Sequence, residues 1–453
     1  MAKRSQVKKA RRLDALEQIN RNAAGIDIGG EEVYVAVPPD RDAESVRSFP
    51  TFTADLRRMA EWLKACRIET VAMESTGVYW IPVYDILEAE GFEVYLVNAR
   101  HLKNVSGRKT DVLDCQWIQQ LHTYGLLSPS FRPPEQVVAI RSLVRHREML
   151  VQYRSAHIQH MQKALTVMNL RLTNVLSDIS GVTGLKIIRA IVAGERDPKK
   201  LAQFRDERCA KSETEIAKSL EGHYKPEQVF VLKQALELYD FYDQQLRGCD
   251  LQLEAMYRQF GPPENPGTPP PSPRTRKRRK NQAHFDLAPA LYRMTGVDLT
   301  QIDGVDELTI QKVLSETGTD MNRWPTVKHF ASWLRLCPNN RITGGKIQQT
   351  GVQPTKNQAS TALRVAAASL KHSDSALGAY YRRMRARNGA PAAVTATAHK
   401  LARIIYFMLK DRKPYHDMGS DYFEQQHRDR AIRNLNRQAT RLGFRLELAH
   451  PNP

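Results

Sequence analysis

The chain has 453 residues, enough for two to four domains that each bury a hydrophobic core. Lysine and arginine total 68 against 49 aspartates and glutamates, a formal charge of +19, so the sequence favours a polyanionic partner such as nucleic acid over an acidic small molecule. It contains no run of about 18 apolar residues and no apolar signal segment near its start, which argues against the membrane and secreted classes. Five scattered cysteines without a Cys-x-x-Cys pair argue against a disulfide framework and a zinc ribbon, and predict a cytoplasmic protein with reduced thiols.

The N-terminal third predicts an α/β domain. A basic segment, residues 1–20, precedes two short β-branched runs within 23–37, which Gly29 and Gly30 separate as in a hairpin. A third strand is expected near 46–52. Helix, strand, helix, strand and helix then follow over residues 56–63, 70–73, 78–90, 93–97 and 111–124. The order βββαβαβα predicts a mixed sheet with helices packed on it, as a domain over residues 21–134.

The middle of the chain predicts a helical stalk over residues 135–261. Residues 135–172 form one long helical pattern, and 226–260 form a second. Apolar residues recur every seventh position in the second helix, at Leu232, Tyr239, Leu246, Leu253 and Phe260. Because the partner positions of that repeat are only partly apolar, a helical hairpin or dimer stalk is expected, and a continuous two-stranded coiled coil is not assigned.

A Pro-rich basic segment, residues 262–285, predicts a solvated linker, because seven prolines in 262–273 and the cationic run 274–280 (RTRKRRK) cannot bury a core. The cationic run is either a plain charged loop or a phosphate contact. Beyond it we expect a small helical domain over 286–412 and a charged helix and tail over 413–453.

Four acids stand out in the predicted α/β domain. Asp27 and Glu74 each end an apolar strand run, whereas Asp111 and Asp114 lie three apart at a helix start and so share one face. Singly, each has a plain explanation: a strand acid facing solvent, or a first-turn acid that stabilises the helix dipole by about 0.3–1 kcal/mol. Together they match what a ribonuclease-H-like sheet needs to hold two Mg²⁺ ions for phosphoryl transfer on nucleic acid.

The same residues carry a family resemblance. GIDIG at 25–29, together with MESTGVYWIPVYDILEAEGFEVYLVNARHLKNVSGRKTDVLDCQWIQQLHTYGLL at 73–127, closely resembles the DEDD transposases of bacterial insertion sequences. A second block continues the likeness, with LTQIDGVDELTIQKVLSETG, WLRLCPNNRITGGKIQQTG and ALRVAAASL. The resemblance covers about 21–135 and 287–412. It implies a RuvC-like N-terminal domain, a helical C-terminal transposase domain, and metal-ligand roles for Asp27, Glu74, Asp111 and Asp114.

The second block also departs from the family. The loop at 341–346 usually carries a serine nucleophile, and this chain has Thr343 there, followed by Gly344, Gly345 and Lys346. A threonine hydroxyl can attack a phosphate, although its methyl group crowds the attack. Loss of strand cleavage, or a substitute hydroxyl at Ser332, Thr350 or Ser360, remains open. The turn at 302–305 resembles a helix-hairpin-helix in which Gly304 lets backbone N–H groups face a phosphate, with a plain interhelical turn as the alternative.

The resemblance further implies DNA donor and target, a structured guide RNA, and a homodimer or homotetramer whose protomers share a site. Candidate nucleic-acid contacts are Arg108, Lys109, Arg141, Arg145, Arg154, Lys163, Gly304, Gly344, Gly345 and Lys346. The leading hypothesis is an RNA-guided, Mg²⁺-dependent transposase with a hydroxyl nucleophile. Two alternatives stay open: a junction nuclease that uses water, and a non-catalytic nucleic-acid-binding remnant.

Overall fold

The computed structural model describes residues 17–75, 77–98, 111–263, 265–271, 280–349 and 351–447. Its contacts divide the chain into two compact units, one ending at Arg132 and the other beginning at Pro133. The finer division into six segments stays a prediction. Four predicted features lie partly or wholly outside the described residues: the N-terminal basic segment, Arg108 with Lys109, most of the RTRKRRK run, and Thr350.

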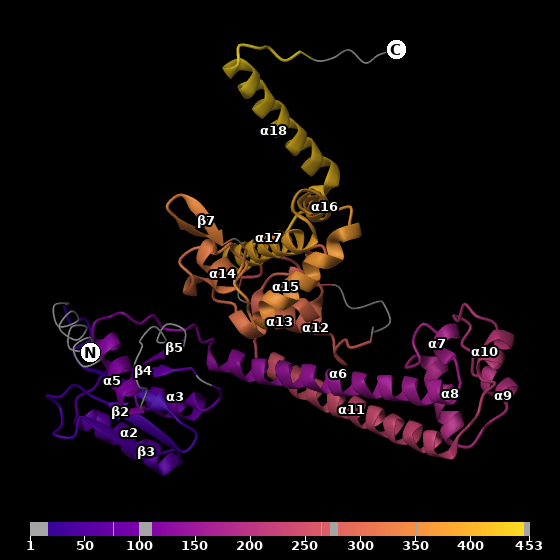
Figure 1. The fold of residues 1–453 in the computed structure, drawn as a ribbon, viewed down its shortest axis with the longest axis horizontal. Helices are drawn as coiled ribbons and strands as arrows, with labels where there is room; N and C mark the ends of the chain where they lie inside the picture. The colour runs from indigo at the N-terminus through magenta and orange to yellow at the C-terminus, as the bar shows by residue number, and fades with distance from the viewer. Residues whose placement is uncertain are drawn as a thin grey trace. The chain divides into compact units, whose positions relative to one another are not determined.

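The N-terminal unit is built on a five-stranded mixed sheet (Figure 1). Its strands are β1 (Ala23–Ile28), β2 (Glu32–Ala36), β3 (Val46–Pro50), β4 (Thr70–Glu74) and β5 (Glu93–Val97). They lie in the order β3-β2-β1-β4-β5. The pairs β1–β2 and β2–β3 are antiparallel, and β1–β4 and β4–β5 are parallel. The predicted mixed α/β sheet is confirmed and is compatible with a ribonuclease-H-like domain.

Helices cover both faces of this sheet because its strands carry apolar residues on both sides. The core beneath α2 (Thr53–Ala65) and α3 (Trp80–Ala89) is the larger one, with Ile26, Val35, Met59, Leu63 and Met73 among its fully buried members. On the opposite face, α5 (Asp111–Thr123) packs through Ile118 onto Ala72 and Val97. Alternate residues of β1 and β4 therefore face α5.

Gly25 allows α5 to lie against the sheet. A Cβ atom at this position would come within 2.2 Å of the Gln119 backbone nitrogen and 2.4 Å of the Cys115 carbonyl oxygen. The space that the missing side chain of Gly25 leaves is therefore filled by the backbone of α5 and is not room for a phosphate or metal.

Two 33-residue helices, α6 (Glu135–Val167) and α11 (Pro226–Arg258), lie side by side in the second unit (Figure 1). Arg147 pairs with Asp250 and Arg154 pairs with Asp243, so the partners are seven residues apart on each helix and run in opposite directions. The expected helical hairpin thus forms within one chain. Of the predicted seam, Leu232, Tyr239, Leu246 and Leu253 are buried, and Phe260 lies past the end of the helix.

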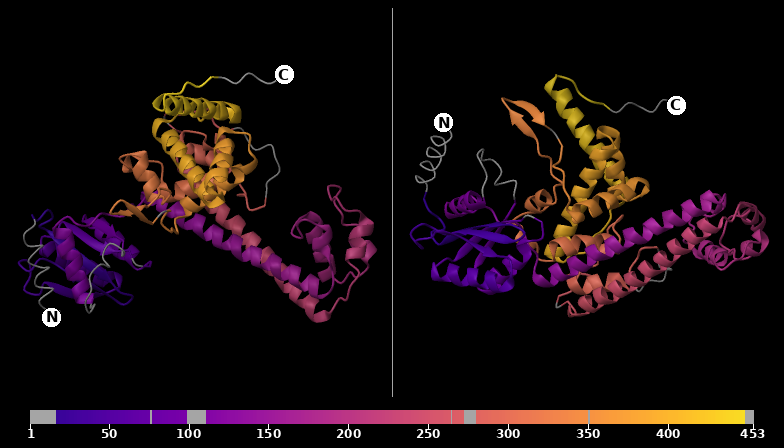
Figure 2. Two further views of the ribbon diagram at one scale, coloured as in Figure 1. Left: turned by 45° about the horizontal axis from the view of Figure 1, so that its top comes forward. Right: turned by 60° about the horizontal axis from the view of Figure 1, so that its bottom comes forward.

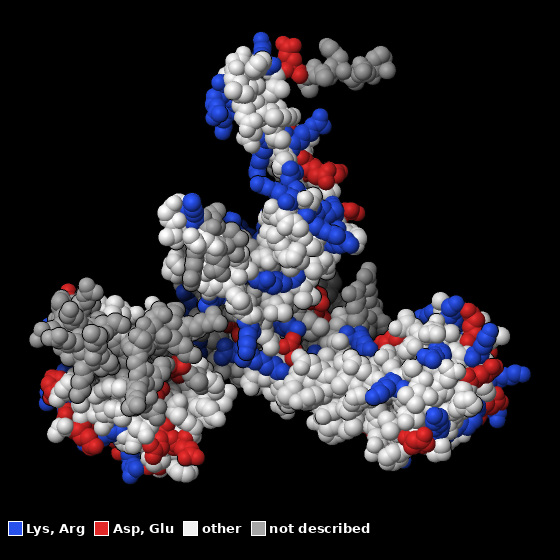
Figure 3. All heavy atoms as spheres, in the orientation of Figure 1, with Lys and Arg blue, Asp and Glu red and all other residues white. Residues whose placement is uncertain are grey.

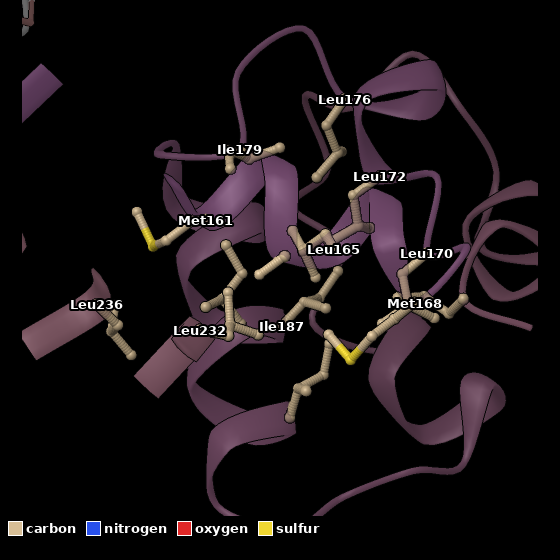
Figure 4. Close-up of a cluster of buried hydrophobic side chains, with 14 of the residues drawn as sticks. Met161, Leu165, Met168, Leu170, Leu172, Leu176, Ile179, Ile187, Leu232 and Leu236 are labelled. Atoms are coloured by element: carbon tan, nitrogen blue, oxygen red, sulfur yellow. The ribbon is translucent and has the colours of Figure 1, made fainter. Parts of the chain in front are cut away.

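Short helices connect α6 to α11 and close the far end of the pair. They are α7 (Leu172–Val175), α8 (Val182–Val192), α9 (Pro198–Ala202) and α10 (Glu213–Ser219). Figure 4 shows the apolar cluster that they form with α6 and α11, in which Met161, Leu165, Ile187 and Leu232 are at most 1% exposed.

The C-terminal region is helical apart from one hairpin (Figure 2). The helices are α12 (Leu287–Thr295), α13 (Glu307–Thr317), α14 (Val327–Trp333), α15 (Gln358–Ser369), α16 (Ala376–Asn388), α17 (Ala390–Asp411) and α18 (Gly419–Arg441), with the short 3-10 turns η1 (Leu299–Gln301), η2 (Met321–Arg323) and η3 (Leu370–His372). The hairpin pairs β6 (Arg341–Thr343) with β7 (Lys346–Gln349).

The segment predicted as a solvated linker packs against this region on both described sides. Thr268 is 5% exposed and accepts a hydrogen bond at its carbonyl oxygen from the Tyr292 hydroxyl at 2.6 Å. On the other side Phe285 is buried, and His284 donates its backbone N–H to Asp250 at 3.1 Å. The prediction of a solvated linker is therefore wrong at Thr268, His284 and Phe285, which find partners on α11 and α12, whereas Pro262, Pro266, Pro269 and Pro270 are exposed as expected.

No helix among the described residues combines the length and the apolar character needed to cross a bilayer. All five cysteines are free thiols.

Candidate functional site

Asp27 and Glu74 lie at the same level on neighbouring strands. In the parallel pairing of β1 with β4, Ile26 is opposite Met73, and these two acids come one residue later. They share the α5 face of the sheet with Gly25 and Ala72, because side chains alternate along a strand. Adjacent strands are about 4.8 Å apart, so the two half-buried carboxylates emerge close together at the carboxyl ends of β1 and β4.

Helix α5 brings a third acid to this edge. Burial raises the pKa of the Cys115 thiol to about 12, and the charges of Asp27 and Asp114 contribute to the rise. Both carboxylates are therefore near Cys115, the residue that follows Asp114. Asp111 is the first residue of α5, but its side chain lies outside the described part of the structure.

The donors at this edge suit a hard cation. Among the described side chains, which leave out the Asp111 carboxylate, no group of three or more potential ligands is close enough to hold a metal ion. The acids at this edge offer carboxylates, while Cys115 stays protonated at neutral pH and supplies no thiolate. Carboxylate oxygens are the ligands that Mg²⁺ prefers, so the residues present fit the divalent ion that the sequence implies.

Thr343 lies at the tip of the β6–β7 hairpin. It pairs with Lys346 across a two-residue turn, in which Gly344 has φ +56° and Gly345 has φ +74°. Two positive φ angles are typical of the type I′ turn, which glycine adopts without strain. Both glycines are exposed, and a Cβ atom on either one would meet nothing within 4 Å.

Lys346 shares a face of the hairpin with Thr343. Directly opposite residues of antiparallel strands point the same way, with Cβ atoms about 5 Å apart. Both side chains are exposed. A phosphate that approached the Thr343 hydroxyl would therefore also come within reach of the Lys346 ammonium group.

The substitute hydroxyl groups differ in whether DNA could reach them. Ser360 is 0% exposed within α15, so no DNA backbone can reach its hydroxyl, and this alternative is wrong. Ser332 is exposed on α14 and stays open. Thr350 lies outside the described residues.

The turn around Gly304 has a packing role. Gly304 has φ +76°, and a Cβ atom there would come within 2.8 Å of the Leu370 side chain. Asp303 next to it has a raised pKa because of burial and the nearby charge of Asp417. Glycine is thus required by the fold at this turn, and its contact with a phosphate stays a prediction.

The basic residues of α6 are mostly committed to ion pairs inside the second unit. Arg154 is 5% exposed and bonds Asp243 and, at 2.7 Å, the side-chain oxygen of Asn281. Arg145 donates two hydrogen bonds to Glu316, at 2.7 and 3.0 Å, and Arg141 lies 3.9 Å from the same carboxylate. Arg154 is therefore corrected from a phosphate contact to a structural residue, whereas Lys163 is exposed and remains a candidate.

Two family models match the chain. One, described as a transposase of the DEDD type, matches residues 24–169, which include the strands and helix that carry the acids. The other, described as the transposase IS116/IS110/IS902 family, matches residues 298–382, which include the β6–β7 hairpin. The chain belongs to the IS110 family of DEDD transposases. No curated protein sequence matches this transposase.

The two matched segments together cover about half of the transposase. Outside them lie α7 to α12 and, at the C-terminal end, α17 and α18. The acids and the hydroxyl loop lie inside the two matched segments, so the family resemblance could identify them from the sequence. The basic helices α17 and α18 lie outside, and the sequence showed only that they are rich in positive charge.

Proposed function

We propose that this transposase cuts and rejoins DNA by divalent-metal-dependent phosphoryl transfer, with Asp27, Glu74, Asp111 and Asp114 as metal ligands. The observation that supports the proposal is the placement of Asp27 and Glu74 at one level of β1 and β4, with the charges of Asp27 and Asp114 both acting on the Cys115 thiol of α5. When bound there, two Mg²⁺ ions would offset the charge that develops on the attacking and leaving oxygens.

Thr343 is proposed as the nucleophile. Its hydroxyl loses a proton as Oγ1 bonds to a DNA phosphorus, and the P–O bond to the neighbouring nucleotide breaks, with the released DNA oxygen taking up a proton. Rejoining reverses these bond changes with a new DNA hydroxyl. The exposed position of Thr343 at an open Gly-Gly turn, with Lys346 opposite, supports this role.

The remaining assignments rest on the family resemblance. They are a structured guide RNA that selects donor and target by base pairing, a dimer or tetramer whose protomers share sites, and a cytoplasmic location. Lys163 and Lys346 are proposed to contact phosphates, which adds affinity without sequence preference.

A trapping assay tests the nucleophile. The protein is incubated with Mg²⁺, guide RNA and a nicked target DNA from which the rejoining strand can diffuse away, and the covalent protein–DNA adduct is counted after denaturation. We expect Thr343→Ser to form the adduct at least as fast as the parent, because the crowding methyl group is gone, and Thr343→Ala and Asp27→Asn to form none. Ser332→Ala is the matched control and should behave as the parent.

The same assay separates the alternatives. A junction nuclease that uses water would cleave DNA with Thr343→Ala but never yield an adduct. A binding remnant would yield neither product with any variant, including Thr343→Ser. An adduct that forms with Thr343→Ala would show that another hydroxyl attacks, with Ser332 the first to test.

A further inference from the structure

Three C-terminal helices meet around Lys400 of α17. Its Nζ atom lies 4.3 Å from the ring centre of Tyr380 on α16 and 5.1 Å from that of Phe423 on α18. The two rings are 6.0 Å apart and nearly perpendicular. Phe423 thereby joins the first turns of α18 to α16 and α17, through aromatic and cation–π contacts.

Positive charge is concentrated at this junction. Burial lowers the pKa of Lys400, and the neighbouring Arg403 and Arg430 lower it further. The pKa of His427 is also lowered, by desolvation and then by the charges of Arg383 and Arg430. The charged groups that shift these two pKa values are all arginines, and Asp411 is the acid that lies beside Lys400 and Arg403, so positive charge is in excess at the described part of the junction.

The cationic surface continues along α18. At about 100° per residue, Arg430, Arg437 and Arg441 fall within roughly 40° of the direction of Phe423. The acids of this helix, Asp421, Glu424 and Asp429, fall between about 100° and 160° away from it. None of the side chains of α18 is buried, and Figure 3 shows Lys and Arg gathered over this helix and its junction with α16.

The length of the surface matches a nucleic-acid backbone. Arg430 to Arg441 spans eleven residues, or roughly 16 Å at 1.5 Å per residue, and all three arginines are exposed. In the described part of the chain no acid forms an ion pair with any of the three. Both α17 and α18 lie past residue 382, where the family match ends, so this surface lies outside the matched segments.

We propose that Lys400, Arg403, Arg430, Arg437 and Arg441 form one continuous surface that binds the phosphate backbone of duplex DNA. The proposal rests on the proposed function only in taking DNA as the substrate. It assigns the C-terminal helices a role in holding DNA without reading its sequence, because the five side chains offer guanidinium and ammonium groups that suit phosphate oxygens.

Duplex DNA fits this surface better than RNA. The second half of α18 is exposed all round and has the diameter of an ordinary helix, about 10–12 Å, which the major groove of B-form DNA admits. The major groove of A-form RNA is too narrow for it.

The test measures binding of the full-length transposase to a labelled DNA duplex, and to an RNA duplex of equal length, in EDTA over a series of salt concentrations. Because EDTA removes metal ions, binding in this test does not depend on the four acids or on Thr343. The binding proposal can therefore be contradicted while the proposed function still holds. The test variant is Arg430→Gln/Arg437→Gln/Arg441→Gln. The matched control, Lys186→Gln/Lys199→Gln/Lys218→Gln, removes the same charge from exposed positions on α8 to α10.

We expect the arginine variant to bind duplex DNA about tenfold more weakly at about 150 mM salt, and to show a salt dependence smaller by roughly 2–3 in log–log slope. The lysine control should change affinity less than twofold, and RNA binding of the arginine variant should change less than DNA binding. Equal losses in the two variants would overturn the proposal, as would a larger loss for RNA. A single comparison of Arg437→Gln with Arg428→Gln, which lies about 140° from the Phe423 direction, repeats the test with one charge.

Discussion

Gly25 and Gly30 lie in one hairpin, but we expect their substitution by alanine to have different effects on stability. A Cβ atom on Gly25 would collide with the backbone of α5 at 2.2 Å, whereas one on Gly30 would meet nothing within 4 Å. We expect Gly25→Ala to lower the free energy of unfolding of the N-terminal unit by about 3 kcal/mol or more, since helix and sheet must separate. Gly30→Ala should change it by less than about 0.5 kcal/mol. Denaturant titration of both variants measures the difference, and equal values would show that α5 does not pack as described.

His122 makes the stability of the same unit depend on pH. The ring is fully buried against Tyr95, with Nε2 2.8 Å from the Thr70 hydroxyl, and burial lowers its pKa to about 4. Between pH 6.5 and 4 the unfolded chain binds a proton that the folded chain does not, so stability is complete above about pH 6.5 and falls as the pH approaches 4. Thermal melts across this range should show that loss in the parent and a smaller one in His122→Gln. If His122→Gln loses as much stability as the parent over this pH range, groups other than His122 cause the loss.

At the scale of elements, the α6–α11 pair depends on charges placed inside it. Arg147 and Asp250 are both buried and bond each other at 2.5 and 3.2 Å. Removing one partner leaves the other charged and buried, so Arg147→Ala should destabilise the second unit by about 3–5 kcal/mol. Arg189→Ala breaks a bidentate pair with Asp240 in which both side chains are 40–50% exposed, and should cost at most about 1 kcal/mol. Guanidinium unfolding of the two variants measures their losses in free energy of unfolding. Similar losses would mean that α6 and α11 do not pack together in solution.

The tip of the β6–β7 hairpin is exposed, in contrast to the buried charges between α6 and α11. It carries the proposed nucleophile next to an exposed turn of two glycines, whereas Asp27, Glu74 and Asp114 lie on strands and a helix that pack in a core. A rigid acid site and an exposed hydroxyl are suited to different tasks: the first must hold metal ligands in place, and the second must reach a DNA backbone.

For the whole molecule, the acids and Thr343 belong to different compact units. If the proposed sharing of sites between protomers holds, Asp27→Asn and Thr343→Ala damage different halves of a composite site. We expect each variant alone to recombine no reporter plasmid, and co-expression of the two to restore a measurable fraction of parental recombination. Co-expression of Asp27→Asn with Glu74→Gln, which damage the same half, is the control and should restore none. If co-expressed Asp27→Asn and Thr343→Ala form a stable mixed oligomer but restore no recombination, both halves of each site belong to one protomer.

The sequence by itself determined the order of strands and helices in the N-terminal unit and the positions of Asp27, Glu74 and Asp114, because strand alternation and the ends of apolar runs are local properties. The tertiary structure decided what local patterns do not contain: that Gly25 makes room for α5, that Arg154 is buried against Asp243, and that Ser360 cannot reach DNA. Those outcomes depend on which segments pack together over long distances in the chain. The same holds for the cationic surface, since the contact of Phe423 with Lys400 aligns the arginines of α18 with Lys400 and Arg403 of α17.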